Sequence, residues 1–424
     1  MSVRTERTPI EPELVGTSVG SRHAGFLPAF YKMASREFGA FAAMIAIIGG
    51  GICGLGVGWR LAQAGEDVTV YDRGTAGMEA TWAAAGMLAP QVEAEHGEEA
   101  LLPLALESRA MWKEFAAELF KVSGIDVDYR EEGTMVVGLD RDDVEHLEHR
   151  FSYFQSLGLD VEWLSGYETR KREPHLARAV GGAVYSALDH QVDNRKVAEA
   201  LRAAFSAAGG TLRENVEVTG VATAGGRISA IETADGRIDT DTIVLAAGAW
   251  SRNLAGLPEI SRPPVRPLKG QMVAVQMEPR FPLIETVIWG PGNGVVPSIY
   301  LAPKSNGRLI IGATVEEMGF DTGLTAGGIM ELLRLAWDVL PGIYDLPLVE
   351  SWAGLRPASR DDAPILGPTP TPGLFLATGH HRNGILLAPL TAKAICDCVR
   401  NGEVGSSIEP FLLDRFEKPV AANV

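Results

Sequence analysis

The chain has 424 residues, 46% hydrophobic and 22% charged, with 48 glycines, which describes a globular protein large enough for two domains and excludes a disordered, collagen-like or disulfide-scaffold chain. Acidic residues outnumber basic ones by 54 to 38, and the formal charge of −16 has the wrong sign for a protein that tracks nucleic-acid phosphates or an anionic membrane surface. The three cysteines, Cys53, Cys396 and Cys398, are too few for a disulfide framework and favour a cytoplasmic location.

Residues 1–43 show no hydrophobic period and mix prolines, serines and charges of both signs, which predicts a flexible tail. Met33 and Met44 lie close to the start of the patterned region, so either is a candidate start of the protein. The run from Phe38 to Trp59 carries no charge and is long enough for a membrane span. Six glycines between Gly49 and Gly58 instead favour a strand, a turn and a helix, and we see no secretory signal.

The first strand, Ile45–Ile48, runs into a G-x-G-x-x-G turn and a helix expected to end near Ala64. This is the dinucleotide-binding pattern: Gly49 allows the tight turn, Gly51 the close approach of a pyrophosphate, and Gly54 the packing of the helix on the strand. The backbone N–H groups and positive end of the helix would hold the phosphates. A second strand, 67–71, ends at Asp72, a carboxylate placed to accept ribose hydroxyls, which favours NAD or FAD over NADP.

Two further segments could contact the ring system of a dinucleotide cofactor. The run of small residues from Ala80 to Leu88 lets backbone lie against a planar ring, although a packed loop or a helix start explains it equally well. Near the carboxyl end, a strand at 374–377 enters a Gly-His-His-Arg-Asn-Gly turn, and a helix follows to about Val399. That helix would place its positive end beside an anionic group such as a reduced flavin. The alternative is a docked terminal helix with a solvated turn.

In these segments the chain resembles the FAD-dependent amine and amino-acid oxidases of the D-amino-acid oxidase superfamily, and within them the glycine oxidase family of thiamine biosynthesis. The resemblance covers about residues 46–416. It rests on ATWAAAGMLAP at 80–90, HQVDNRK at 190–196, YLAPKSNGRLIIGAT at 300–314, WAGLRP at 352–357 and GHHRNGILLAP at 379–389.

The resemblance implies non-covalent FAD and names the residues that bind it. Besides the glycines of the turn, these are Ile52, Cys53, Asp72, Arg73, Ala80, Thr81, Ala85, Gly86 and Met87, with Val216 touching the adenine and His380, His381, Arg382, Asn383, Gly384, Ile385 and Leu386 beneath the flavin. It also implies that Arg356 pairs with the substrate carboxylate, helped by Tyr300, with Arg382 beside them. Ser298 departs from relatives that carry a histidine two residues before the tyrosine.

The implied reaction is the oxidative deamination of glycine, or of small amines or D-amino acids, with oxygen as acceptor and peroxide, ammonia and glyoxylate as products. The imine would supply thiazole synthesis, which makes the thiazole synthase a partner, and the family suggests a homotetramer. A planar guanidinium matches a carboxylate with two parallel hydrogen bonds. Without the resemblance, Arg356 and Arg382 would be interpreted as structural ion pairs. Open alternatives are a D-amino-acid or sarcosine oxidase or dehydrogenase, and a flavoprotein subunit that has lost catalysis.

Two other candidate sites have weaker support in the sequence. His146 and His149 lie three apart on a predicted helix, where a solvated charged face explains them better than a metal site does. Cys396 and Cys398 would point to different sides of a helix and are expected to be small buried side chains.

The expected fold class is α/β: a Rossmann-type FAD-binding domain from segments 44–125, 186–262 and 350–424, and an antiparallel-sheet substrate domain from 126–185 and 263–349. The substrate domain should contain a strand at 270–276 and a hairpin, 299–303 with 309–314, whose turn carries Asn306-Gly307. A helix at 326–340 should cover one side of it.

Overall fold

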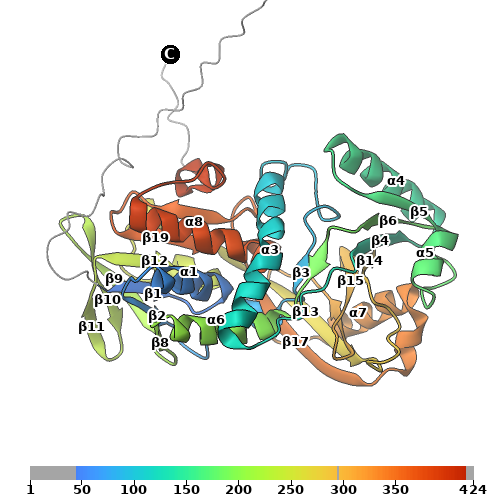
Figure 1. Cartoon of the computed structure of the whole chain (residues 1–424), viewed down its shortest axis with the longest axis horizontal. Coiled ribbons are helices and arrows are strands. Elements are labelled where there is room, and N and C mark those ends of the chain that lie inside the picture. The colour runs from blue at the N-terminus through green and yellow to red at the C-terminus, as the bar shows by residue number, and fades with distance from the viewer. Residues whose placement is uncertain (1–43, 294–295, 417–424) are drawn as a thin grey trace, which may run out of the picture.

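The computed structural model describes residues 44–293 and 296–416, and the predicted flexible tail lies outside them. Two main sheets stand at opposite ends of the described part, with helix α3 (Leu101–Ser123) between them (Figure 1). No helix within the described residues is both long and apolar enough to cross a membrane.

The first sheet has six strands. In spatial order they are β18 (Ile365–Pro368), β19 (Leu374–Thr378), β12 (Thr242–Leu245), β1 (Ile45–Ile48), β2 (Val68–Tyr71) and β8 (Thr211–Arg213). All pairs are parallel except β18 with β19. A central parallel strand is covered on both faces, which explains why every residue of β1 is apolar and buried.

Each face of this sheet packs against a different layer. Ile45 and Ile47 belong to the core shared with α1 (Ile52–Gln63), α6 (Asn194–Ala207) and α8 (Ala388–Asn401). Ala46 and Ile48 belong to the core beneath a three-stranded sheet of β9 (Val218–Ala224), β10 (Arg227–Thr233) and β11 (Gly236–Asp239). Side chains of a strand alternate between faces, so one four-residue strand serves both cores.

The second sheet has eight strands. In spatial order they are β17 (Leu348–Ala358), β13 (Arg266–Gln276), β16 (Arg308–Gly312), β15 (Ser298–Pro303), β14 (Val287–Pro291), β4 (Thr134–Gly138), β6 (Gly182–Ser186) and β5 (Glu162–Ser165). Helix α7 (Ala326–Val339) packs on its central strands, and α4 (Arg141–Ser156) on β4 and β6.

Short elements complete the described part. They are α2 (Ala80–Ala83), α5 (Gly166–Arg172), the paired β3 (Met87–Leu88) and β7 (His190–Gln191), and the 3₁₀ helices η2 (Gly248–Asn253), η3 (Glu259–Ser261), η4 (Pro341–Asp345), η5 (His381–Asn383), η6 (Glu409–Phe411) and η7 (Leu413–Phe416).

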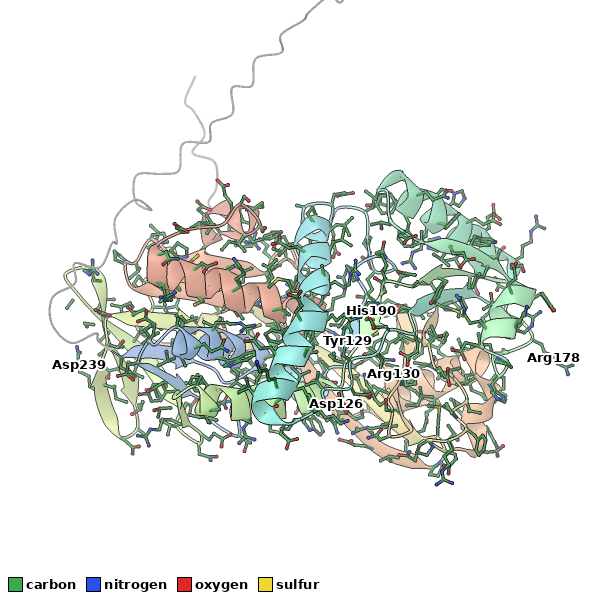
Figure 2. The ribbon with its side chains drawn as sticks, viewed as in Figure 1. Asp126, Tyr129, Arg130, Arg178, His190 and Asp239 are labelled. Atoms are coloured by element: carbon green, nitrogen blue, oxygen red, sulfur yellow. The ribbon has the colours of Figure 1, made fainter. Side chains whose placement is uncertain are left out.

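Residues just before β4 fasten the β3–β7 pair to the second sheet. Tyr129 Oη lies 2.7 Å from His190 Nδ1, and Figure 2 shows both beside Arg130 near the centre of the molecule. Arg130 exchanges backbone hydrogen bonds with Gln191, and its guanidinium donates to the Pro303 carbonyl at 2.9 Å. The β15 hairpin and the β3–β7 pair are therefore held as one unit.

The expected elements are largely present. The first strand, the helix after the glycine turn, the Asn306-Gly307 hairpin and the helix at 326–339 all occur, and Gly307 has the positive φ of +82° that the turn requires.

Three features differ from the sequence predictions. Residues 348–358 form β17, which pairs along β13 in the second sheet, whereas the boundary predicted at residue 350 divides this strand between the two expected domains. The second sheet also contains one parallel pair, β14 with β4, among its antiparallel ones.

The third difference is the start of the last helix, which begins at Ala388 rather than directly after the turn that ends at Gly384. His381, the first residue of η5, has a φ of +49°, and residues 384–387 form turns before the regular helix. Pro389 lies in the first turn of α8, where its missing N–H costs no hydrogen bond.

Candidate active site

A cavity of about 1130 Å³ lies between the two sheets and is lined by residues of both. Most of the site residues expected from the sequence line it: Gly49, Gly51, Ile52, Cys53, Asp72, Arg73, Ala80, Thr81, Ala85, Gly86, Met87, Tyr300, Arg356, His380, His381, Arg382, Asn383, Gly384, Ile385 and Leu386. Gly54 and Val216 are not among the lining residues; Val216 packs beside the core under β9 and donates its N–H to the Asp72 carbonyl.

The glycine turn between β1 and α1 forms one end of the cavity. A Cβ at Gly49 would lie 2.4 Å from the Ala246 carbonyl oxygen, and one at Gly54 would lie 1.9 Å from the Gly49 oxygen. At Gly51 the nearest atom would be Thr81 Oγ1 at 3.4 Å, so this glycine faces open space. Two glycines thus allow close backbone packing, and the third leaves room for a ligand.

Asp72 at the end of β2 ties this turn to the sheet. Its carboxylate accepts hydrogen bonds from the N–H groups of Gly50 at 2.8 Å and Gly74 at 2.9 Å. Each oxygen has a further lone pair, and the residue lines the cavity. Asp72 can therefore accept a ligand hydroxyl while it holds the turn.

Lys304 supports the part of the cavity wall that contains Ala85. Its ammonium donates to the carbonyls of Ala85 and Val192, each at 2.7 Å, and to Gln191 Oε1 at 3.0 Å. Burial lowers the pKa of Lys304 to about 8. Sequence reasoning gave this residue no role, although a lysine inside an otherwise apolar hairpin motif was a usable signal.

Arg356, on β17, lies at the other end of the cavity. Its Nη1 donates to the carbonyls of Thr314 at 3.1 Å and Lys269 at 3.4 Å, and no carboxylate of the described residues forms an ion pair with it. A Cβ on Gly270 would lie 2.6 Å from Nη1, so glycine at that position makes room for the guanidinium. Burial lowers the pKa of Arg356, while the charge of Glu316 raises it.

Tyr300 stands beside Arg356. Its ring lies 5.1 Å from that of Trp289, and its hydroxyl lies 3.7 Å from Met272 Sδ. Burial raises the pKa of Tyr300 above its usual value, so the phenol keeps its proton and can donate a hydrogen bond.

Arg382 has a different environment, because it is already paired. Its Nη1 and Nη2 donate to Glu98 at 2.9 and 2.5 Å, and its Nε lies 3.5 Å from Glu93 Oε2. Burial opposes the charge, but these two carboxylates outweigh it and hold the pKa of Arg382 above its usual range. The structural ion pair considered for both arginines is therefore found at Arg382. The sequence analysis did not single out Glu93 or Glu98.

The histidines after β19 are neutral near pH 7. Burial lowers the pKa of His380 to about 4, and its Nε2 lies 3.1 Å from Thr391 Oγ1 and 3.5 Å from Cys53 Sγ. Burial and the charges of Arg382, Arg356 and Arg266 lower the pKa of His381 to about 3.

The remaining candidates are two histidines on α4 and two cysteines on α8. His146 and His149 are exposed on α4 at the cavity lining, and no group of three or more metal-binding side chains occurs among residues 44–293 and 296–416. Cys396 and Cys398 are free thiols buried on α8, as expected.

The residues present fit a bound flavin dinucleotide. Gly51 and the adjacent N–H groups leave open space at one end, and Asp72 offers a carboxylate there. At the other end, His381 Nδ1 and Trp289 Nε1 are buried cavity-lining atoms without a hydrogen-bond partner in the described part of the chain. Such atoms normally find a partner, and a ligand would supply one.

Comparison with known proteins agrees with this geometry. A family model described as FAD dependent oxidoreductase matches residues 44–398. A glycine oxidase from Geobacillus kaustophilus is 37% identical over 374 residues, which cover 88% of this chain and 96% of that protein. Its crystal structure superposes with a TM-score of 0.82 at 36% identity, covering 89% of this chain and 100% of that one.

A longer relative is also similar. The bifunctional protein ThiO/ThiG from Synechocystis is 37% identical over 378 residues, which cover 88% of this chain but 54% of that protein. These comparisons confirm the predicted fold class and the FAD cofactor.

Proposed function

Since the chain belongs to the FAD dependent oxidoreductase family, we propose that its reaction is the oxidative deamination of glycine, and of other small amines or D-amino acids, to the imine and glyoxylate with release of ammonia and hydrogen peroxide. The observation that carries the proposal is Arg356: a buried guanidinium in the cavity wall that has no carboxylate partner among the described residues.

Arg356 and Tyr300 are the substrate-binding pair in this proposal. A guanidinium binds a carboxylate through two charge-assisted hydrogen bonds, and the Tyr300 hydroxyl adds a third donor. The neighbouring walls are formed by Trp289, Met272 and Ala313, which leave little polar surface for a long side chain. A small α-amino acid is therefore the substrate class that suits this end of the cavity.

The opposite end holds the cofactor. Gly51, Ile52 and the α1 N-terminus would bind the pyrophosphate, Asp72 the ribose, and the backbone of Ala85–Met87 with that of Asn383–Leu386 would border the flavin. Bound FAD supplies the two-electron acceptor. The protein contributes orientation, a dry cavity and fixed charges.

Arg382 supports the site in a different way from Arg356. Because Glu98 occupies its guanidinium, we assign it to the wall that closes the cavity rather than to the substrate carboxylate. The turn from His380 to Leu386 then carries both this ion pair and the residues beside the flavin.

The partners follow from the same proposal. The ThiO/ThiG relatives join a similar chain to a second part of a bifunctional protein, which supports a thiazole synthase as the recipient of the imine. We further propose a homotetramer and, from three cysteines that are all free thiols, a cytoplasmic location.

Anaerobic mixing of the purified flavoprotein with glycine tests the proposal. Loss of the visible flavin absorption, followed by its return with peroxide when air is admitted, is the expected result. Bleaching by D-proline or sarcosine but not by glycine would keep the oxidase reaction and remove the thiamine role. No bleaching by any of them would indicate a subunit without catalysis.

A further inference from the structure

Glu93 lies in the same cavity as Arg356. It belongs to the segment between β3 and α3, and its side chain is 16% exposed. The backbone on its N-terminal side is fixed: Asp189 accepts hydrogen bonds from Gln91 and Val92 N–H, the latter at 2.8 Å, and Arg150 donates to the Val92 carbonyl at 2.8 Å. The backbone that leads into Glu93 is thus held in place by Asp189 and Arg150.

The charge balance around Arg382 leaves Glu93 only partly compensated. Arg382 makes its two short hydrogen bonds to Glu98, at 2.9 and 2.5 Å, whereas Glu93 Oε2 lies 3.5 Å from Nε. The Arg382 guanidinium therefore faces two carboxylates and forms its bidentate hydrogen bond with Glu98. Arg356, as described, is a cation without a carboxylate. The cavity wall thus carries, at Arg356, a cation without a carboxylate partner among the described residues and, at Glu93, a carboxylate that shares its cation with Glu98.

Tyr300 relates the positions of these two charges. Burial is the main cause that raises the pKa of the Tyr300 hydroxyl. The charge of Arg356 lowers this pKa, and the charge of Glu93 raises it. Glu93, Tyr300 and Arg356 also line the same cavity, so a ligand in that cavity is exposed to both charges. An α-amino acid in its ordinary ionised form carries an anion and a cation a few bonds apart, and so complements both.

We propose that Glu93 receives the ammonium group of the substrate whose carboxylate Arg356 holds, and that it accepts one proton from that group before the substrate is oxidised. This inference rests on the proposed oxidation of small amino acids. In the transfer, one N–H bond breaks, its electron pair stays on nitrogen, and the proton forms an O–H bond with a Glu93 oxygen. The products are a neutral amine and a carboxylic acid, and Glu93 later returns the proton to water.

The electrostatics of Glu93 suit an acceptor that works near neutral pH. Burial raises the pKa of Glu93 to about 7 against the charge of Arg382, with Glu95 and Glu98 also raising it. Arg150 from α4, Tyr300 from β15 and Asp189 before β7 are the other titratable groups that sense its charge. Since the carboxylate form accepts the proton, kcat/KM should rise with pH through about 7.

Glu93→Gln tests the assignment because it keeps the shape and removes the charge. We expect kcat/KM for glycine at pH 7 to fall about 10²-fold or more, and the rise near pH 7 to be replaced by one that follows the amine's own ionisation. Glu93→Asp keeps a carboxylate and should retain the pH limb at reduced rate. Glu114→Gln removes an exposed carboxylate of α3 that does not line the cavity and should change kcat/KM less than about twofold.

Glycolate binding gives a second readout that needs no turnover. Glycolate has the carboxylate but no ammonium, and it can be titrated by its effect on the visible flavin spectrum. In the unmodified protein its affinity should weaken as Glu93 ionises above pH 7, and in Glu93→Gln this weakening should disappear.

The outcomes separate the two proposals. Oxidation of glycine by the unmodified protein, with an unchanged pH profile and unchanged glycolate binding in Glu93→Gln, would overturn the role of Glu93 and keep the proposed function. Failure of the unmodified protein to oxidise any small amino acid would overturn the proposed function itself. A pH-dependent glycolate affinity that is lost in Glu93→Gln would still establish that Glu93 faces the bound anion.

Discussion

The two ends of the cavity are built in different ways. At the β1–α1 end, the contacts are made mainly by backbone, and glycines decide how closely the chain approaches itself. At the Arg356 end, charged side chains from β17, η5 and the segment after β3 meet across large sequence separations. The first end depends on local geometry and the second on the balance of charges. Substitutions at the two ends should therefore have different effects on stability, FAD affinity and activity.

The largest effect is expected from Arg356→Lys. Lysine cannot reproduce a bidentate pair, and two charge-assisted hydrogen bonds at about 1.5–3 kcal/mol each correspond to a loss of about 10²–10⁴-fold in kcat/KM on amino acids. The flavin should stay bound, and a simple amine without a carboxylate should be oxidised almost as before. Steady-state kinetics on both substrates checks this, and equal losses would contradict the carboxylate role.

Arg382→Lys is the matched control at this end of the cavity. It disturbs a bidentate bond to Glu98 that is already made in the free protein. We therefore expect less than about a tenfold change in kcat/KM, with the loss appearing as lower stability, because breaking a buried pair destabilises the fold. A larger kinetic loss than that of Arg356→Lys would reverse the roles given to the two arginines.

At the other end, Gly54→Ala and Gly51→Ala should differ from each other. The added methyl at Gly54 would lie 1.9 Å from the Gly49 oxygen, so the unfolding free energy should fall by about 2–3 kcal/mol. The methyl at Gly51 meets only Thr81 Oγ1 at 3.4 Å, so the fold should persist while FAD affinity drops. Thermal unfolding and flavin titration of both variants measure stability and FAD affinity. Similar results for the two variants would contradict the assignment of Gly54 to packing and Gly51 to FAD binding.

Lys304→Met sharpens the comparison, because Lys304 joins the two ends. The substitution keeps the length and leaves the carbonyls of Ala85 and Val192 without their donor, at a cost of about 2 kcal/mol in unfolding free energy. FAD should bind more weakly, since the Ala85–Met87 wall loses its support. Denaturant unfolding with a parallel FAD titration measures both, and a normal FAD affinity would remove Lys304 from the positioning of that wall.

The smallest effect is expected from His146→Ala. His146 is exposed on α4 and belongs to neither end of the cavity interior. Activity, FAD affinity and unfolding temperature should all stay within experimental error, with a change in kcat/KM below about twofold. A larger loss would give the α4 histidines a role that a solvated face does not explain.

The features predicted correctly from the sequence are those that depend on neighbouring residues. The turn after Ile48 and the Asn306-Gly307 hairpin are encoded within a few positions by glycine and by hydrophobic alternation. The contacts at the Arg356 end could not be predicted in this way. Glu98 and Arg382 are separated by 284 residues, and no local pattern tells which carboxylate a distant arginine will meet.

The same reasoning explains the other differences. Strand β17 contains WAGLRP, but its partner β13 lies about 80 residues earlier, so its place in the second sheet depends on pairing rather than on composition. Turns at residues 384–387 precede α8, and His381 has a φ of +49°, a conformation that most residues avoid and that sequence patterns do not reveal. Lys304 belongs to the motif YLAPKSNGRLIIGAT, yet only the three acceptors around its ammonium give it a role.

The cavity wall is assembled from residues between Ile48 and Leu386, which has a consequence for the amount of protein in a cell. Walls brought together from such distant segments form late in folding, and a molecule that binds only the finished cavity stabilises the native state by mass action, by about 4 kcal/mol at a thousand times its dissociation constant. Chains made when flavin is scarce lack that stabilisation and open more often to proteases. Flavin supply should therefore set the lifetime of this protein as well as its catalytic rate.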